Sequence, residues 1–133
     1  MMELKGKTAV VTGGAVRLGR ALLLALAAAG CQVFIHYGRS AGPAIQTREE
    51  AEAYGVKVAS YSANLAEMEA PKRVMETAVA TLGPVDILIN SAAIFPEADS
   101  FSHTDPALWD QLMNVNLRAP FLLSQAFAAQ LSS

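Results

Sequence analysis

The sequence has little of several features that mark other classes of protein. Its single cysteine, Cys31, excludes an internal disulfide and is typical of a protein kept in a reducing cytoplasm. The longest apolar run, Ala21 to Ala29, has nine residues, whereas a membrane-spanning helix needs roughly 18 or more. Residues 1–7 carry charge but no apolar stretch, so they predict no signal peptide. We therefore expect a cytoplasmic protein that has no membrane partner.

An excess of charge is also lacking. The formal net charge is −2, which argues against a nucleic-acid partner. The charges are unevenly placed, because residues 1–48 hold six basic residues and one acidic residue, whereas residues 49–133 hold four basic and eleven acidic ones. With 53% hydrophobic and 17% charged residues, the composition predicts one globular domain over residues 1–133. We expect its positive charge to lie where an anion binds.

Short β-rich runs alternate with longer helical runs along the chain. The expected strands are residues 8–11, 32–37, 56–61 and 85–90. The expected helices are residues 17–29, 43–54, a third from about 67 or 70 to 82, and a last one that Asp105 caps and that continues to the chain end, after a loop over residues 91–104. This alternation predicts an α/β fold of the Rossmann type, a doubly wound parallel sheet in strand order 3-2-1-4 with helices on both faces.

A glycine-containing turn stands between the first strand and the first helix. A helix N-terminus offers free N–H groups and a partial positive charge, and glycines let a phosphate approach the backbone. The turn is not a P-loop, because Arg20 and Ala21 follow Gly19 where Lys and Ser or Thr are needed. It also differs from Gly-x-Gly-x-x-Gly, because Ala15 replaces the second glycine. The candidate phosphate-binding residues are Thr12, Gly13, Arg17, Leu18 and Gly19.

The stretch from Thr12 to Gly19 resembles the Thr-Gly-x3-Gly-x-Gly turn of short-chain dehydrogenases/reductases. Arg17 replaces the middle glycine, which makes the turn similar to that of the pteridine-reductase-like branch. The resemblance covers the whole chain but only about half of a typical family member. It implies the N-terminal, cofactor-binding half of an oxidoreductase that transfers hydride to or from a carbonyl or imine.

The end of the second strand predicts which dinucleotide binds. An acidic residue there selects NAD, and a basic residue accommodates the 2′-phosphate of NADP. The chain has no acid at this place; Arg39 can fork onto a phosphate and Ser40 can donate a hydrogen bond. We therefore predict NADP(H) as the cofactor, the alternative for Arg39 being a solvated loop residue. His36 either contacts phosphate or is a strand histidine with other partners.

Further candidates follow the third and fourth strands. The resemblance places Asn64 and Leu65 beside the adenine, although the family usually has Asp at the first position, and a turn or helix cap is the alternative for Asn64. The residues Asn90 to Ala93 resemble the family's Asn-Asn-Ala-Gly, from which Asn90 and Ala92 carry over. A Phe at the place of Phe95 stacks the substrate ring in pteridine reductases, so Phe95 either binds substrate or closes over the core.

The last helix carries one catalytic candidate, Asn116. Because Pro120 has no N–H, it cannot bond the Asn116 carbonyl, and we expect a kink that leaves this carbonyl free for water. The segment resembles the family's helix with the catalytic Asn, whose carbonyl holds a water that relays protons to the active-site Lys and Tyr.

The family's catalytic Tyr-x3-Lys is absent from these 133 residues. The residues four places after the three tyrosines are Ala41, Val58 and Leu65. We therefore expect a chain that is truncated before this motif and inactive alone, from an enzyme with a carbonyl or pteridine-like substrate and a homo-oligomeric state. The alternatives are a non-catalytic dinucleotide-binding or redox-sensing module complete at 133 residues, and an inactive truncation product. An unpaired fourth strand would make the lone monomer unstable.

Overall fold

A computed structural model describes residues 3–95 and 101–131 of the chain. Its sheet has four strands, all of them parallel, in the order β3-β2-β1-β4. This order and the α/β class confirm the fold that the sequence predicts. The strands are β1 (Thr8–Thr12), β2 (Gln32–Tyr37), β3 (Val58–Ser62) and β4 (Ile87–Asn90).

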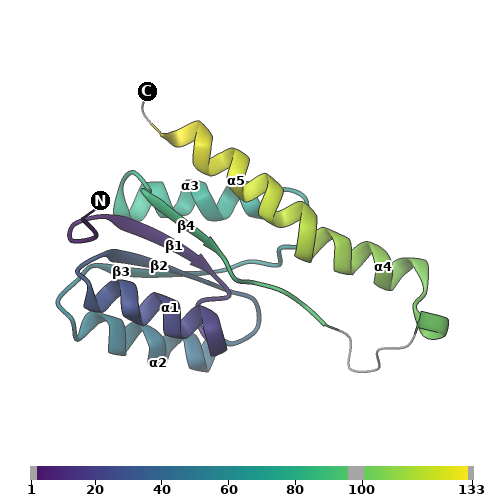
Figure 1. The fold of residues 1–133 in the computed structure, drawn as a ribbon, viewed down its shortest axis with the longest axis horizontal. Helices are drawn as coiled ribbons and strands as arrows, with labels where there is room; N and C mark the ends of the chain where they lie inside the picture. The colour runs from purple at the N-terminus through teal and green to yellow at the C-terminus, as the bar shows by residue number, and fades with distance from the viewer. Residues whose placement is uncertain (1–2, 96–100, 132–133) are drawn as a thin grey trace.

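Helices cover both faces of the sheet (Figure 1). Val10 of β1 packs in the core on the side of α3 and α5, and its neighbour Val11 packs on the side of α1 and α2. Successive strand residues point to opposite faces, and here both faces are covered, which is why β1 is buried along its whole length and apolar from Ala9 to Val11. The covering helices are α1 (Arg17–Ala28) and α2 (Ala41–Glu52) on one face, and α3 (Ala70–Leu82) and α5 (Ala119–Gln130) on the other.

Several boundaries differ by two residues from those expected. β4 begins at Ile87 and not at Val85, because the backbone N–H and carbonyl of Val85 form hydrogen bonds with the Gln130 side chain instead of with a neighbouring strand. Gln130 Oε1 accepts from Val85 N–H at 2.9 Å, and Gln130 Nε2 donates to the Val85 carbonyl at 2.8 Å. α2 begins at Ala41, before Pro43, because a proline in the first turn interrupts no helical hydrogen bond. β3 likewise starts at Val58 instead of residue 56.

The last helix runs from Pro106 to Gln130 and contains an irregular turn near the place where the sequence predicts a kink. α4 (Pro106–Met113) leads into a π-turn (Asn114–Arg118) and then into α5, and Asp105 caps α4 through Oδ1, which accepts from Leu108 N–H at 2.8 Å. Pro120 cannot donate to the carbonyl four residues earlier, and Ala119 N–H bonds the Asn114 carbonyl five residues back. The irregularity predicted around Asn116 is therefore a widened turn. A short 3₁₀ turn, Phe101–His103, lies within the expected loop.

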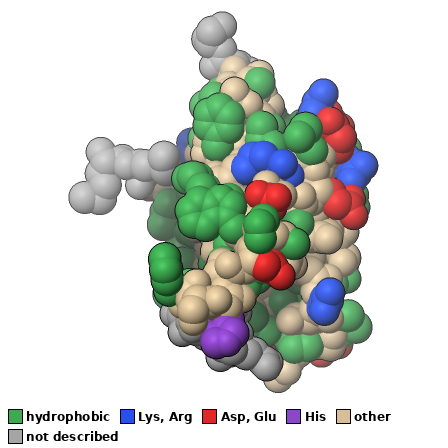
Figure 2. Space-filling model, turned by 90° about the vertical axis from the view of Figure 1, so that its right-hand side faces the viewer, with side chains coloured by type: hydrophobic (Ala, Val, Ile, Leu, Met, Phe, Trp, Pro, Cys, Tyr) green, Lys and Arg blue, Asp and Glu red, His purple; other side chains and the backbone are tan. Residues whose placement is uncertain are grey.

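The carboxyl ends of the strands point toward α4, which extends beyond the sheet (Figure 1). Seen from that side, apolar side chains gather at the surface (Figure 2). The exposed ones at this end of the fold include Phe95, Phe101 and Trp109. No helix within residues 3–95 and 101–131 has both the length and the apolar character that crossing a bilayer requires.

Candidate functional site

A cleft of about 1110 Å³ opens at the carboxyl ends of the strands. Ligands of open α/β sheets bind at this edge, and the volume suits a small-molecule cofactor. The cleft brings together most of the residues selected from the sequence. Those that line it are Gly13, Arg17, Leu18, Gly19, His36, Arg39, Ser40, Asn64, Leu65, Ala92 and Phe95.

Three predicted residues, Thr12, Asn90 and Asn116, lie outside this lining, and sequence reasoning missed part of it. Ser62 and Ala63 stand directly before Asn64 at the end of β3, so their place at the strand end was the available signal. The side of α4 that faces the cleft has the helical spacing i, i+3, i+4, which the sequence does not distinguish from core packing. The other missed residues include Val16, Ser91, Ile94, Leu108, Gln111 and Leu112.

Two glycines, Gly13 in the first turn and Gly19 in α1, stand where another backbone segment comes too close to leave room for a Cβ. Gly13 has φ 62°, and a Cβ there would lie 3.0 Å from the Ala92 Cα. A Cβ on Gly19 would lie 2.8 Å from the carbonyl carbon of Gly13. The start of α1 therefore packs directly on the turn that precedes it, and the turn packs on the segment after β4.

The N-terminus of α1 faces the cleft with free amides. The first backbone bond at its start runs from Arg20 N–H to the Val16 carbonyl at 3.1 Å, and the N-cap Val16 has no side-chain acceptor. The amides of residues 17–19 thus have no partner within the helix, and the helix dipole adds partial positive charge. Arg17 adopts φ 52°, a left-handed conformation that is costly for a residue with a Cβ.

Thr12 joins the end of β1 to the segment that follows β4. Its buried Oγ1 accepts hydrogen bonds from the N–H groups of Ser91 and Ala92, both at 3.0 Å. These bonds hold the segment after β4 against the end of β1. The Thr12 hydroxyl is therefore engaged in shaping the cleft wall.

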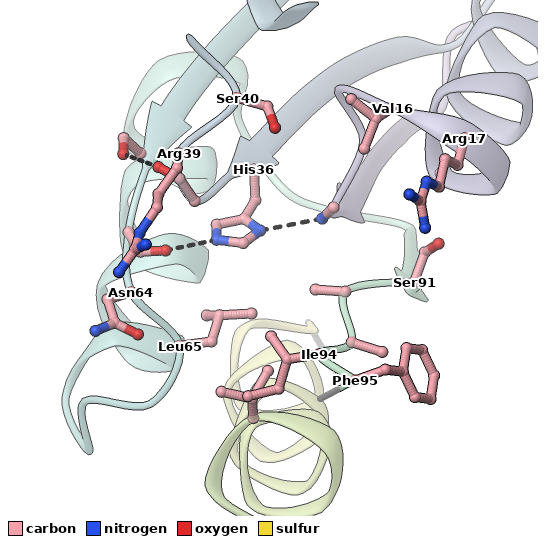
Figure 3. Close-up of a pocket in the computed structure, with 18 of the residues that line it drawn as sticks. Val16, Arg17, His36, Arg39, Ser40, Asn64, Leu65, Ser91, Ile94 and Phe95 are labelled. Carbon is pink, nitrogen blue, oxygen red and sulfur yellow. Dashed lines mark hydrogen bonds between the residues drawn. The ribbon is translucent and has the colours of Figure 1, made fainter. Parts of the chain in front are cut away.

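His36 lies between the two loops on this side of the cleft (Figure 3). Its Nδ1 accepts from Gly13 N–H at 3.1 Å, and its Nε2–H donates to the Ala63 carbonyl at 2.9 Å. This pair of bonds requires the neutral ring with its proton on Nε2. Burial lowers the pKa of His36, which is only 3% exposed. Both nitrogens are used, so of the two sequence-based alternatives the structure favours the histidine satisfied by other partners.

Arg17 and Arg39 stand on opposite sides of the cleft, with His36 between them (Figure 3). Among the described residues, neither guanidinium has a carboxylate within salt-bridge distance, and no Asp or Glu lines the cleft. Arg48, in contrast, pairs with Glu52 on α2 at 2.9 Å. The two cleft arginines therefore present uncompensated positive charge to whatever enters. Within the described part of the chain no three His, Cys, Asp or Glu side chains gather as metal ligands.

Asn64 and Leu65 form the wall after β3. Asn64 Oδ1 accepts from Ala66 N–H at 3.0 Å, which closes an Asx turn and leaves Nδ2 as the side-chain donor. The Leu65 side chain is 4% exposed and packs in the core with Phe34. A ligand can therefore contact Leu65 mainly through its backbone.

Phe95 lines the cleft next to α4, whereas Asn116 lies outside the lining. The Asn116 side chain makes two bonds with Ile94, donating from Nδ2 to its carbonyl and accepting from its N–H, both at 2.9 Å. This anchors the segment after β4 to the π-turn, a role that the sequence did not indicate. Phe95 is 83% exposed and lines the cleft, so it does not close over the core.

A comparison with protein families agrees with this geometry. The family model described as short chain dehydrogenase matches residues 7–133. The chain belongs to the short-chain dehydrogenase family. This short-chain dehydrogenase chain is 37% identical to 2-dehydro-3-deoxy-D-gluconate 5-dehydrogenase of Escherichia coli K12, over 95% of the chain and 48% of the relative.

Solved structures give the same result. A short-chain dehydrogenase of Burkholderia cenocepacia in complex with NADP has a TM-score of 0.94 and 36% identity, over 99% of this chain and 54% of that one. FolM alternative dihydrofolate reductase 1 of Brucella canis, complexed with NADP, has a TM-score of 0.90 and 29% identity, over 99% and 53%. The present chain spans about half the length of the curated relatives it matches.

Proposed function

We propose that this short-chain dehydrogenase chain binds NADP(H) in the cleft and is the cofactor-binding part of an oxidoreductase acting on a carbonyl or imine. The observation that carries the proposal is the pair Arg17 and Arg39, which stand on opposite sides of the cleft without carboxylate partners among the described residues. When bound, the nicotinamide supplies the hydride, and the protein supplies binding and orientation.

The residues at the cleft suit the parts of a dinucleotide. The free amides of residues 17–19, with Gly13 and Arg17, suit the pyrophosphate. Arg39 and Ser40 suit the 2′-phosphate, because a guanidinium binds phosphate oxygens in pairs and a hydroxyl adds one donor. Asn64 Nδ2 and the Leu65 backbone suit the adenine, and the small Ala92 lets the cofactor lie close to the chain.

The charge of the lining supports NADP(H) over NAD(H). A 2′-phosphate carries about −1.5 to −2 charges near neutral pH, by analogy with other phosphate monoesters. A carboxylate at the end of β2 would repel it, and the lining described above contains none. The NADP in the Burkholderia cenocepacia and Brucella canis structures supports the same choice for their relative.

The substrate side of the proposal rests on Phe95 and Asn116. The exposed Phe95 ring offers a flat apolar surface for a carbonyl or pteridine-like substrate. Asn116 is the proposed relay residue through its carbonyl, to which Pro120 cannot donate. Because no Lys stands four places after any of the three tyrosines, we expect the 133 residues alone to bind cofactor without turnover.

Two further properties belong to the proposal. Trp109, Leu117 and Phe121 are each about 60% exposed on the segment from α4 to α5, which supports a subunit contact and hence a homo-oligomer. The free and buried Cys31 supports a cytoplasmic location.

The test is the affinity of the Arg39→Ala variant for NADP⁺ and NAD⁺, measured by titration calorimetry. We expect Kd for NADP⁺ to rise about tenfold, since Arg39 is exposed and a charge-assisted hydrogen bond is worth about 1.5–3 kcal/mol at most. The NAD⁺ affinity should stay unchanged. Arg48→Ala is the matched control, because Arg48 pairs with Glu52 outside the cleft. An unchanged NADP⁺ affinity in Arg39→Ala would exclude the proposed cofactor choice.

A further inference from the structure

His36 connects two loops that line opposite sides of the cleft. On one side, two consecutive amides donate to it, from Gly13 to Nδ1 at 3.1 Å and from Gly14 to the His36 carbonyl at 3.0 Å. On the other side, its Nε2–H holds the carbonyl of Ala63, the residue before Asn64. A single buried ring thus sets the distance between the turn after β1 and the segment after β3.

We propose that His36 is a positioning residue for the cofactor, which holds both loops in place only while its ring is neutral, so that protonation of the ring weakens NADP(H) binding. The inference rests on the proposed function. It assigns His36 an indirect role, through Gly13 and Ala63, in place of a direct phosphate contact, which was one of the two alternatives that the sequence left open.

The hydrogen bond from Gly13 determines the direction of the effect. A proton added to Nδ1 turns the acceptor into a donor, so that two N–H groups face each other inside the protein. The ring is buried, and water cannot replace the lost acceptor without the loop opening. Gly13 packs against Ala92 and Gly19 packs against Gly13, so Gly13 cannot shift without moving its neighbours. When protonation pushes Gly13 away from the ring, the start of α1 must move with it. The amides that face the cleft are then displaced.

The charges around His36 act in the same direction. Arg17 at the start of α1 and Arg39 after β2 are both cationic and flank the ring (Figure 3). Tyr61 is its register partner on β3. No carboxylate within the described lining is there to stabilise an imidazolium. The phosphates of a bound dinucleotide favour the charged ring at longer range. The direct bond from Gly13 is the shorter contact, so the net effect of protonation is weaker cofactor binding.

The experiment measures Kd for NADP⁺ by calorimetry between pH 8 and pH 5.5, since the oxidised cofactor is stable in acid. In wild-type protein, Kd should rise by up to about tenfold per pH unit below the pKa of His36. In His36→Asn, an amide oxygen takes the place of Nδ1 and does not titrate. That variant should bind about three- to tenfold more weakly at pH 8, because the bond to Ala63 is lost. Its remaining pH dependence should be that of the 2′-phosphate, which titrates near pH 6 by analogy with phosphoserine.

The other histidine, His103, provides the control. His103→Asn should keep the wild-type pH profile, because His103 lies in the 3₁₀ turn outside the cleft lining. Identical slopes in wild type and His36→Asn would overturn the inference while leaving the cofactor proposal intact. No binding by the wild type at any pH would overturn both.

Imidazole ¹⁵N spectra of the wild type give a test that needs no variant to fold. The expected result at pH 8 is a neutral His36 with its proton on Nε2. A proton on Nδ1 instead would contradict the bond from Gly13 and overturn the inference.

Discussion

The tightest backbone contact at the cleft makes Gly19→Ala a severe substitution. A Cβ at this position would lie 2.8 Å from the Gly13 carbonyl carbon and closer still to its oxygen. Ordinary contacts between carbon atoms lie at about 3.5–4.0 Å, so the start of α1 and the turn must separate by roughly 1 Å. Overpacking of this kind costs about 1–3 kcal/mol, which exceeds the roughly 1 kcal/mol that Ala gains over Gly in a helix.

We therefore expect Gly19→Ala to lower the free energy of unfolding by about 1–2 kcal/mol and to weaken NADP⁺ binding at least tenfold, because the displaced amides face the cleft. Urea denaturation and calorimetric titration measure the two effects. The matched control is Gly42→Ala in α2, where an added Cβ meets nothing within 4 Å. The reasoning is refuted if Gly19→Ala matches Gly42→Ala in both stability and affinity.

Three further predictions concern neighbouring groups. Thr12→Val removes the acceptor of two partly buried amides, those of Ser91 and Ala92, and should cost about 1–3 kcal/mol in urea denaturation; a loss below 0.5 kcal/mol would contradict the assigned bonds. Arg17→Gly removes the backbone strain of a left-handed conformation and should raise the free energy of unfolding by about 0.5–1 kcal/mol. NADP⁺ affinity should fall about tenfold. A fall in both stability and affinity would refute this reasoning. Burial holds the pKa of His36 below its ordinary value of 6.5, so the unfolded chain binds more protons in acid. Stability should therefore fall by up to about 1.4 kcal/mol per pH unit as the pH drops below 6.5, and His36→Asn should remove that slope in denaturation at pH 8, 6.5 and 5.5.

Much of the fold could be read from local pattern. The nearly continuous apolar runs of the strands and their alternation with helices predict the 3-2-1-4 sheet, because a sheet covered on both faces buries consecutive residues such as Val10 and Val11. Element ends were less predictable. Val85 looks like a strand residue, yet Gln130, 45 positions away, takes its hydrogen bonds. A contact across the fold leaves no mark in the local pattern.

The candidate site divides in the same way. The turn from Gly13 to Gly19 and the basic Arg39 were recognisable from the sequence, since residue type and place after a strand carry the chemistry. The partners of His36 were not, because its side chain can face a ligand or a backbone equally well. Asn116 was expected to act through its carbonyl, and its side-chain bonds to Ile94 depend on how α4 and α5 meet the segment after β4.

The sequence by itself thus determined the fold class, the order of the strands and the cleft at their carboxyl ends, because periodicity and turn residues are local properties and parallel crossovers are almost always right-handed. Only the tertiary structure decided which polar groups are left to bind a ligand. Hydrogen bonds such as those of Thr12 and His36 join residues 23 to 80 positions apart, and such pairing depends on packing, which no single segment specifies.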